Sequence, residues 1–590
     1  MRKVFALTAV FVLLCFGGTA QAQEVSVALP GASATTGILS GTSLVLVDRT
    51  VPAGYMLLYR AYDGSYRDPV VLVEGFDPMN TTLPASVYAT ANASGAIDMI
   101  RAAGRSVWVV NFGDGGGALT ANAKLVSHAI QAASSYEGAG ASVDVVGLSM
   151  GGVISRYALA YDEQYGGGSD GLVRLFLSGD SPQQGANAPI SLQEIILFSA
   201  DPTYTPLLNC DAALSLLYTS VRGYGDNGCW LGALPSATNW TGSSAAHDWF
   251  YSTLNGLNGN GYPHKCRNVA VSNGSFSPQP HSVGETIYAA RTYFLGLNVC
   301  SQNYPAQPLD VAPGSLGIDF APGNIRQSNF ELDERFVATF IPTVSALDTT
   351  GGVSKFDRTL VQTAAVNHST VTTDTTDFIL EEALGPARAY NPKYLPDGAN
   401  AALYDWIVTA AFNGYFYAES PGRLSGLLIF SSAPVQEGTV VVVRGVTSTA
   451  GGERRMNATS VTVRGNATVP GAFGMPLSSL GGGPVGASTP GITGGSGLNN
   501  VGLLVRGSGK VTQIGSGYLY IDDGSNLKDG TATGQYENIG VRVICDPTGY
   551  TIGDYVAVTG ISSCFQTPTQ QIARRIITRR ADDVQAVSGP

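Results

Sequence analysis

The stretch VDVVGLSMGGVISRYALA, residues 143–160, decides the fold class of this chain. Its β-branched apolar start predicts a buried strand, and the amphipathic pattern from Gly152 onward predicts a helix. A turn this tight needs small residues on both sides of its apex, and Gly147 and Gly151 supply them. The apex residue, Ser149, is therefore expected to stand above the sheet with its hydroxyl exposed, near the positive end of the helix.

Short apolar segments and helical patterns alternate around this stretch, over roughly residues 40–185. The predicted strands are 69–74, 106–112, 142–146 and 173–178, and the predicted helices are 91–103, 121–136 and 152–162. Apolar strands separated by helices are typical of a parallel sheet covered on both faces. We therefore expect an α/β fold with a doubly wound, mostly parallel sheet.

Later segments are expected to complete the core of this domain and to add a second domain. The segments 268–272, 340–348 and 366–374 are predicted core segments, and a helix near 401–412 is predicted to close the core. The α/β domain is expected over 23–415, with a Trp- and Gly-rich cap insertion at about 186–262. A linker at 416–424 and a Val-rich, all-β domain over 425–590 follow, because 590 residues are too many for one core.

Charge separates the two parts of the chain. From residue 425 onward there are 12 Lys+Arg and 10 Asp+Glu, a charge of +2; subtracting from totals of 33 and 44 leaves 21 and 34, or −13, for the rest. So weak a positive charge is not typical of nucleic-acid binding, and an acidic catalytic part is not drawn to anionic polymers. We expect no nucleic-acid partner.

The first residues indicate export. Residues 1–22 carry two early cations, an apolar core and an Ala-Gln-Ala cleavage pattern, as a secretory signal peptide does. The predicted location is secreted, cell-surface or periplasmic.

Removal of that segment leaves an even number of cysteines, six in all. In an exported chain they favour disulfides, and neighbour pairing is the simplest of about fifteen arrangements, with free thiols as the alternative. The predicted pairs are Cys210 with Cys229, Cys266 with Cys300, and Cys545 with Cys564.

Three segments resemble the α/β-hydrolase superfamily, and more narrowly the secreted lipases and GPI inositol-deacylase-like lipases. They are PVVLVEGFDP (69–78), DVVGLSMGGVISRYAL (144–159) and LFLSGDSPQQGAN (175–187), and the resemblance covers roughly residues 55–410. The chain departs from the family at Glu74, Leu148 and Gln183, each of which stands where the family has histidine. None of those histidines is the family's catalytic base, so the departures concern substrate and loop packing.

A serine hydroxyl needs a histidine to take its proton and an acid to orient that histidine. In this fold the chain order is serine, acid, histidine, which removes His128 and favours His368 in VNHST over His247, His264 and His281. Two aspartates are candidates for the acid that orients the histidine. Asp180 ends the strand beside the nucleophile strand, and Asp348 follows FIPTVSAL; turn capping is the alternative role for each.

An oxyanion formed at Ser149 needs two preorganised donors. The resemblance implies the backbone N–H groups of Phe76 and Met150. Zinc spacings, a Walker loop and a dinucleotide fingerprint are all lacking in the sequence, so no metal or cofactor is expected. The run Gly113 to Gly117 is expected to form a loop at the active site.

The resemblance implies an exported serine hydrolase that cleaves carboxylic esters through an acyl-enzyme. Apolar residues in the cap suit an acyl chain, with ordinary packing as the alternative: Leu207, Leu208, Leu214, Leu216, Leu217, Trp230 and Trp240. The rival hypotheses are a non-catalytic cell-surface binding protein on the same scaffold and a peptidase or thioesterase.

The C-terminal domain resembles OB-fold-like barrels appended to exported bacterial proteins. Such barrels bind oligonucleotides or sugars. Tyr518 and Tyr520 are candidate stacking residues near a small arginine cluster at 574–580. With the weak charge, this favours attachment to a cell surface or a polysaccharide.

Overall fold

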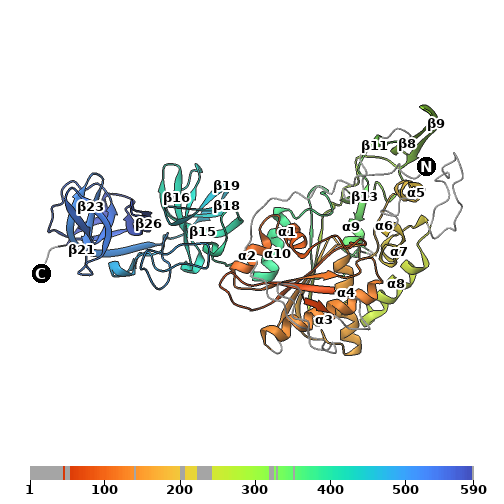
Figure 1. Ribbon diagram of the computed structural model, residues 1–590, viewed down its shortest axis with the longest axis horizontal. Coiled ribbons are helices and arrows are strands. Elements are labelled where there is room, and N and C mark those ends of the chain that lie inside the picture. The colour runs from red at the N-terminus through yellow and green to blue at the C-terminus, as the bar shows by residue number, and fades with distance from the viewer. Residues whose placement is uncertain are drawn as a thin grey trace.

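The computed structural model shows an elongated molecule, with an α/β part at one end and two β-barrels in a row at the other (Figure 1). It describes residues 44–46, 54–138, 141–199, 206–221, 242–317, 325–326, 330–349 and 352–587. The predicted signal peptide, Cys229, Trp230 and Trp240 lie outside these residues. Among the helices of the described residues, none has the length and apolarity needed to cross a membrane.

The α/β part is built on an eight-stranded sheet in the order β1-β2-β4-β3-β5-β6-β7-β14. β1 and β2 are antiparallel to their neighbours, and every pair from β4 to β14 is parallel. The strands are β1 (Leu44–Leu46), β2 (Gly54–Tyr59), β3 (Val70–Val73), β4 (Val107–Phe112), β5 (Val143–Leu148), β6 (Val173–Gly179), β7 (Arg267–Ser272) and β14 (Arg358–Val361). The predicted mostly parallel sheet is confirmed, and its order fits an α/β-hydrolase fold.

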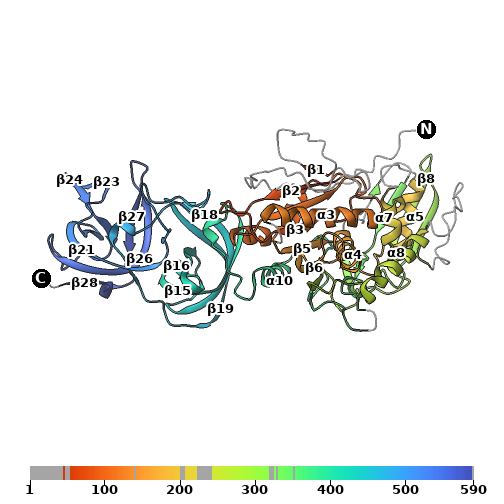
Figure 2. The same cartoon turned by 90° about the horizontal axis from the view of Figure 1, so that it is seen from below.

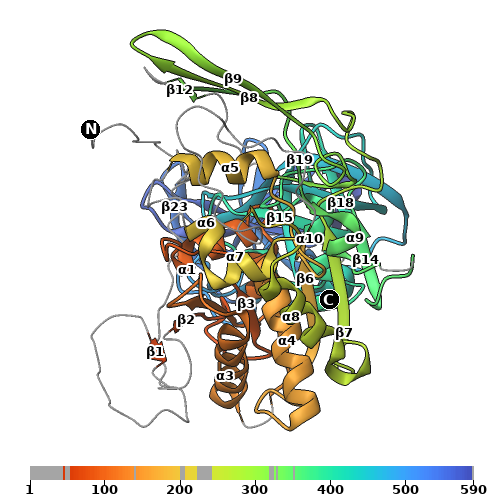
Figure 3. The ribbon, with the colours of Figure 1, turned by 90° about the vertical axis from the view of Figure 1, so that its right-hand side faces the viewer.

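Helices cover both faces of this sheet, because successive residues of each buried strand point to opposite sides. On β4, Val107 and Val109 pack with α1 (Pro84–Ala91), α2 (Ala96–Ala102) and α10 (Thr373–Leu384). Trp108 and Val110 pack on the other face with α3 (Leu119–Glu137) and α4 (Met150–Tyr165), which lie side by side (Figure 3). Both faces are therefore buried, which explains the all-apolar strands.

The described part of the segment between β6 and β7 is largely helical. It contains α5 (Ile190–Ser199), α6 (Pro206–Asn209), α7 (Asp211–Leu216) and α8 (Ala245–Gly256). Leu208 and Leu217 are buried against Ala188, and Leu216 is buried in the same hydrophobic cluster as residues of α3 and α4. These three leucines therefore pack within the hydrophobic cores of the protein.

A second excursion leaves the sheet after β7. It forms a four-stranded antiparallel sheet whose β8–β9 hairpin projects from the α/β part (Figure 3). Its strands are β8 (Thr286–Phe294), β9 (Leu297–Pro305), β11 (Ile325–Arg326) and β12 (Phe330–Glu334).

Two predicted core segments do not join the central sheet. Residues 340–348 contribute to β13 (Thr339–Pro342), which pairs with β10 (Gly314–Leu316), and to the short helix α9 (Thr343–Ala346). Residues 366–372 form a loop before α10. The last place in the sheet goes to β14, which pairs in parallel with β7. The first segment still contributes to the core, since Ile341 and Leu347 are buried, whereas no residue of 366–374 is buried and that part of the prediction is wrong.

The first barrel begins inside the predicted α/β domain. It closes in the order β15-β16-β17-β19-β18, with β17 and β19 parallel. Its strands are β15 (Asn400–Phe412), β16 (Tyr415–Glu419), β17 (Gly426–Phe430), β18 (Thr439–Ala450) and β19 (Glu453–Asn466). The predicted helix at 401–412 is therefore wrong, since β15 occupies it, and the predicted linker at 416–424 lies within this barrel.

The second barrel lies beside the first (Figure 2). It repeats the same strand order as β21-β22-β25-β27-β26, with β25 and β27 parallel and β21 paired to β26. These strands are β21 (Leu504–Gly515), β22 (Tyr518–Asp522), β25 (Val541–Ile544), β26 (Tyr555–Gln566) and β27 (Ile572–Ile577). The smaller strands are β20 (Phe473–Gly474), β23 (Lys528–Thr533), β24 (Tyr536–Ile539) and β28 (Val584–Ala586). The sequence predicted one all-β domain, and the structure divides it into two barrels.

The first barrel shares a hydrophobic core with the α/β part. Leu403 and Met456 of the barrel belong to the same buried cluster as Ile97 and Ile100 of α2. Lys393 joins the second barrel to this junction, since its buried Nζ donates to Asn499 Oδ1 at 2.9 Å and to the Val501 carbonyl at 2.5 Å. Burial lowers the pKa of Lys393 to about 8.

The predicted disulfides are wrong for the cysteines whose side chains are described. Four of the six are free thiols: Cys210, Cys266, Cys545 and Cys564. Each predicted pair contains at least one of them, so none of the three pairs forms. β27 lies between β25 and β26, which separates the two C-terminal cysteines by about 10 Å across the sheet. A disulfide requires Cα atoms within about 7 Å.

Candidate active site

Ser149 occupies the turn between β5 and α4 in a conformation that L-residues seldom adopt, with φ 51° and ψ −125°. The glycines around it have no room for a side chain. A Cβ on Gly147 would lie 2.5 Å from the Gly152 Cα, and one on Gly151 would lie 2.3 Å from the Glu74 carbonyl oxygen. The small residues therefore allow the strand, the turn and the helix to approach closely enough to present the serine.

His368 lies beside this serine, on the loop between β14 and α10. Its Nε2 is 2.7 Å from Ser149 Oγ, and its Nδ1 is 2.7 Å from Asp180 Oδ2. The ring of Phe340 meets the imidazole edge to face, with centroids 4.9 Å apart. The structure thus brings together three of the predicted site residues in one hydrogen-bonded chain.

Asp180 follows β6 directly and is almost fully buried. Its φ of 44° is again unusual for a residue other than glycine. Oδ2 faces His368, while Oδ1 accepts a hydrogen bond from the backbone N–H of Asn273 at 2.8 Å. Both carboxylate oxygens are therefore engaged, which fixes the direction in which the acid meets the imidazole.

Asn273 is a site residue that the sequence analysis missed. Its side-chain Nδ2 donates to the carbonyl oxygens of Asn367 at 3.0 Å, His368 at 2.8 Å and Thr370 at 2.8 Å. One amide thus holds the histidine loop while its own backbone holds Asp180. Its place directly after β7, at the carboxyl edge of a parallel sheet, is the signal that points to it.

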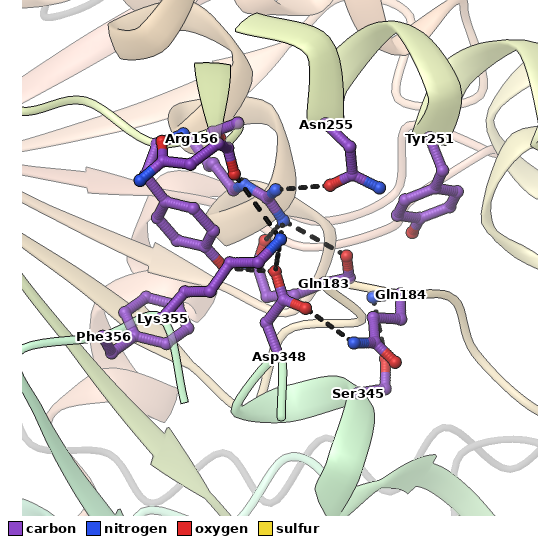
Figure 4. Close-up of polar contacts among 12 residues, drawn as sticks. Arg156, Gln183, Gln184, Tyr251, Asn255, Ser345, Asp348, Lys355 and Phe356 are labelled. Carbon is purple, nitrogen blue, oxygen red and sulfur yellow. Dashed lines mark hydrogen bonds and ion pairs between the residues drawn. The ribbon is translucent and has the colours of Figure 1, made fainter. Parts of the chain in front are cut away.

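Asp348, the alternative acid, lies in a different polar cluster and does not belong to the hydrogen-bonded series of Ser149, His368 and Asp180. It is buried and pairs with Arg156, whose Nη1 is 3.3 Å from Asp348 Oδ2 (Figure 4). Gln184, Tyr262 and Lys355 also contact its carboxylate, at 2.6, 2.9 and 3.4 Å. Of the two candidates, only Asp180 is in hydrogen-bond reach of the imidazole.

The two predicted oxyanion donors belong to the backbone that flanks Ser149. Met150 begins α4 directly after the serine. Gly75 packs under the serine, since a Cβ placed there would lie 3.2 Å from Ser149 Cβ and 3.8 Å from its Oγ. Phe76 therefore directly follows this point of close approach to the nucleophile.

Glu74 supports this backbone from behind. Its carboxyl group accepts hydrogen bonds from Asn111 Nδ2, at 2.5 Å, and from the backbone N–H of Phe112. Burial, with a smaller contribution from nearby Asp77, raises the pKa of Glu74 to about 8 against the lowering effect of the Phe112 hydrogen bond. Glu74 therefore ties the end of β3 to the end of β4.

The other two departures from the family are also accounted for by packing. Leu148 packs against the core and lies next to Gly179. Gln183 is fully buried, and its side chain bonds to Arg156 and to Ser178. The run after Gly113 packs on the loop after β3, where Gly115 donates its N–H to Asn80 Oδ1 at 2.8 Å.

The remaining histidines lie on other parts of the fold. His247 is buried in α8 with Nδ1 3.0 Å from the Ser215 carbonyl oxygen, and burial lowers its pKa. His128 is on α3, His264 lies near Asn260, and His281 stacks on Phe336. Within the described residues, no group of three or more His, Cys, Asp or Glu side chains is placed to hold a metal ion.

Comparison with known proteins gives only distant similarities. No protein-family model matches this sequence, and no curated protein matches it. The mature form of Bacillus licheniformis lipase BlEst2 is 14% identical, with 36% of this chain and 67% of that chain covered and a TM-score of 0.24. Its propeptide form is 10% identical, with 86% of this chain and 96% of that chain covered and a TM-score of 0.29.

Est1E from Butyrivibrio proteoclasticus is 12% identical, with 26% of this chain covered and a TM-score of 0.19, and the chain spans 54% of its length. These TM-scores are too low to support conclusions about function. Any functional assignment therefore depends on the strand order of the sheet and on the geometry at Ser149.

Proposed function

We propose that this protein is a serine hydrolase of the lipase or esterase type, which cleaves carboxylic esters through an acyl-enzyme. The observation that carries this proposal is the hydrogen-bonded chain from Ser149 through His368 to Asp180, with both distances 2.7 Å. A serine at such an apex, a histidine within reach and a buried acid behind it are the three parts of a catalytic triad.

In this mechanism His368 Nε2 takes the hydroxyl proton as Ser149 Oγ attacks the ester carbonyl carbon. The backbone N–H groups of Phe76 and Met150 stabilise the oxyanion. Collapse of the tetrahedral intermediate expels the alcohol, which takes the proton from His368. Water then repeats the sequence on the acyl-enzyme and releases the acid. Asp180 holds the imidazole in the required tautomer throughout.

Labelling with a fluorophosphonate probe tests the proposal. The wild-type protein should label, and Ser149→Ala and His368→Ala should not. A folded wild-type protein that does not label would instead favour the non-catalytic binding protein on a hydrolase scaffold. Matched p-nitrophenyl esters, thioesters and peptide amides would then separate an esterase from a thioesterase or a peptidase.

We further propose that the protein is exported, on the basis of residues 1–22, and that it acts on esters with an apolar acyl chain. The C-terminal barrels are proposed to be OB-fold-like and to contact a cell surface or a polysaccharide. Five strands in a Greek-key barrel support that comparison. Secretion assays and pull-down on insoluble polysaccharides test these points separately.

A further inference from the structure

A buried arginine lies behind the loop that carries Asp180. This acid loop, residues 180–185, crosses over the start of α4, where Ser181 packs so tightly that a Cβ on Gly152 would lie 2.0 Å from its Oγ. One turn further along the helix, the fully buried Arg156 points at the same loop. Its Nη1 lies 3.2 Å from Gln183 Oε1 and 3.3 Å from the Gln183 carbonyl oxygen.

Gln183 passes this contact on to the strand that leads to the acid. Its Nε2 donates to Ser178 Oγ at 2.9 Å, and Ser178 is two residues before Asp180. The side chain thus spans the acid loop from its far end back to β6. Arg156 reaches the catalytic acid through this residue and does not touch the reacting atoms.

The same guanidinium is fixed from other sides (Figure 4). Nε donates to the Gly261 carbonyl at 2.7 Å, and Nη2 donates to Asn255 Oδ1 of α8 at 2.8 Å. Asp348 balances its charge at 3.3 Å, and the cation lies over the Tyr262 ring at 3.9 Å. The planar guanidinium group donates to several partners in fixed directions, which a lysine ammonium group cannot do.

The helix α8 also contacts the acid loop directly. The hydroxyl of Tyr251 donates to the Pro182 carbonyl at 2.5 Å. Arg156 and Tyr251 thus hold two adjacent residues of the loop, Gln183 and Pro182. This matters because Asp180 has a φ of 44°, a conformation that persists only where the surroundings impose it.

We propose that Arg156, neutralised by Asp348, is a positioning residue for the catalytic acid: through Gln183 it fixes the acid loop so that Asp180 meets His368 in line. The inference rests on the proposed function and deepens it. It predicts that loss of the guanidinium group lowers kcat more than it changes KM, because the ester-binding groups are left in place.

The test compares two conservative changes at buried arginines. Arg156→Lys keeps the charge beside Asp348 and loses the guanidinium group. Arg105→Lys makes the same change at another buried pair, in which Arg105 Nη1 lies 2.6 Å from Asp144 Oδ2 at the opposite end of the sheet. Both variants are expected to lose a similar amount of thermal stability, measured as Tm.

Of the two arginine variants, only Arg156→Lys should lose activity, by about tenfold to a hundredfold in kcat for a p-nitrophenyl ester. Its KM should stay within about twofold, since small misplacements of catalytic groups lower the rate by amounts of this size. Gln183→Met, which leaves the Arg156–Asp348 pair intact, should show the same loss. If Arg156→Lys does not fold, Gln183→Met decides the question.

Wild-type kcat in a folded Arg156→Lys, or in Gln183→Met where Arg156→Lys is unfolded, would overturn the inference and leave the cluster a structural role. An equal loss of kcat in Arg105→Lys would overturn it as well. A wild-type protein without fluorophosphonate labelling would instead refute the proposed function, so the two failures are distinguishable.

Discussion

Asn273 holds Asp180 in place, since its backbone N–H donates to Asp180 Oδ1 at 2.8 Å while the other carboxylate oxygen faces His368. Its side chain holds three carbonyl oxygens of the histidine loop at the same time. One residue after β7 therefore sets the position of both partners of the nucleophile.

Replacing Asn273 with alanine should lower kcat/KM by about tenfold to a hundredfold, because the histidine loop loses three hydrogen bonds and the imidazole shifts. Hydrolysis of a p-nitrophenyl ester measures this. Asn268→Ala is the matched control, since that buried amide lies at the other end of the same strand and bonds to the Pro263 carbonyl. Equal activity in both variants would contradict the assigned role.

Asp180→Asn should leave the fold intact and lower kcat by about 10⁴-fold, the effect of an amide that favours the wrong imidazole tautomer in a triad. Asp162→Asn serves as a control, because that buried carboxylate binds Ser127 and Ser169 and lies near the C-terminal end of α4, away from Ser149. An active Asp180→Asn variant would show that a different group orients His368.

Gly75→Ala should slow fluorophosphonate labelling by about tenfold or more, because oxyanion donors act only when correctly placed. The added methyl group would lie 3.2 Å from Ser149 Cβ and push the neighbouring backbone away from the nucleophile. Gly471→Ala, where a Cβ meets no atom within 4 Å, should label at the wild-type rate. If both variants label equally fast, Gly75 is not needed for close approach.

Glu74 should make the protein less stable as pH rises. Its pKa is about 8 in the folded protein and 4.5 without these surroundings, so the unfolded chain releases its proton first. Between about pH 4.5 and 8 this group therefore lowers the free energy of unfolding by roughly 1.4 kcal/mol for each pH unit of increase. Above about pH 8 the free energy does not fall further from this cause.

Urea unfolding at pH 5, 6, 7 and 8 measures this slope. In Glu74→Gln the contribution is absent, so the free energy of unfolding should fall less steeply with pH than in the wild-type protein. Parallel slopes would mean that the carboxyl group is ionised in the folded state across this range.

The four described cysteines should react as thiols. Iodoacetamide treatment of the denatured, unreduced protein should modify Cys210, Cys266, Cys545 and Cys564, as peptide mass spectrometry would show. Without denaturant, Cys564 should react most slowly, because it is buried and burial raises its pKa. A linked peptide containing Cys545 and Cys564 would contradict the strand arrangement.

The turn at Ser149 was predictable because its cause is local: the strand, the glycines and the helix adjoin in sequence. The strand at 400–412 was missed since AALYDWIVTAAF contains good helix formers, and pairing with β16 and β18 overrides that preference. The roles of Asn273 and Arg156 depend on contacts with residues far away in the chain. The place of Asn273 directly after a strand is the only local signal for its role, and no local pattern distinguishes Arg156 from other polar residues.

The core shared by α2 and the first barrel means that the barrel serves as a wall of the α/β layer. Met99 Sδ accepts from the Ala402 N–H, and Leu403 lies in the same buried cluster. A chain cut before Asn400 would leave that apolar face open to water, where such patches promote aggregation. The smallest segment that could be moved between proteins as one folding unit therefore extends to the end of β19, well past the last strand of the central sheet.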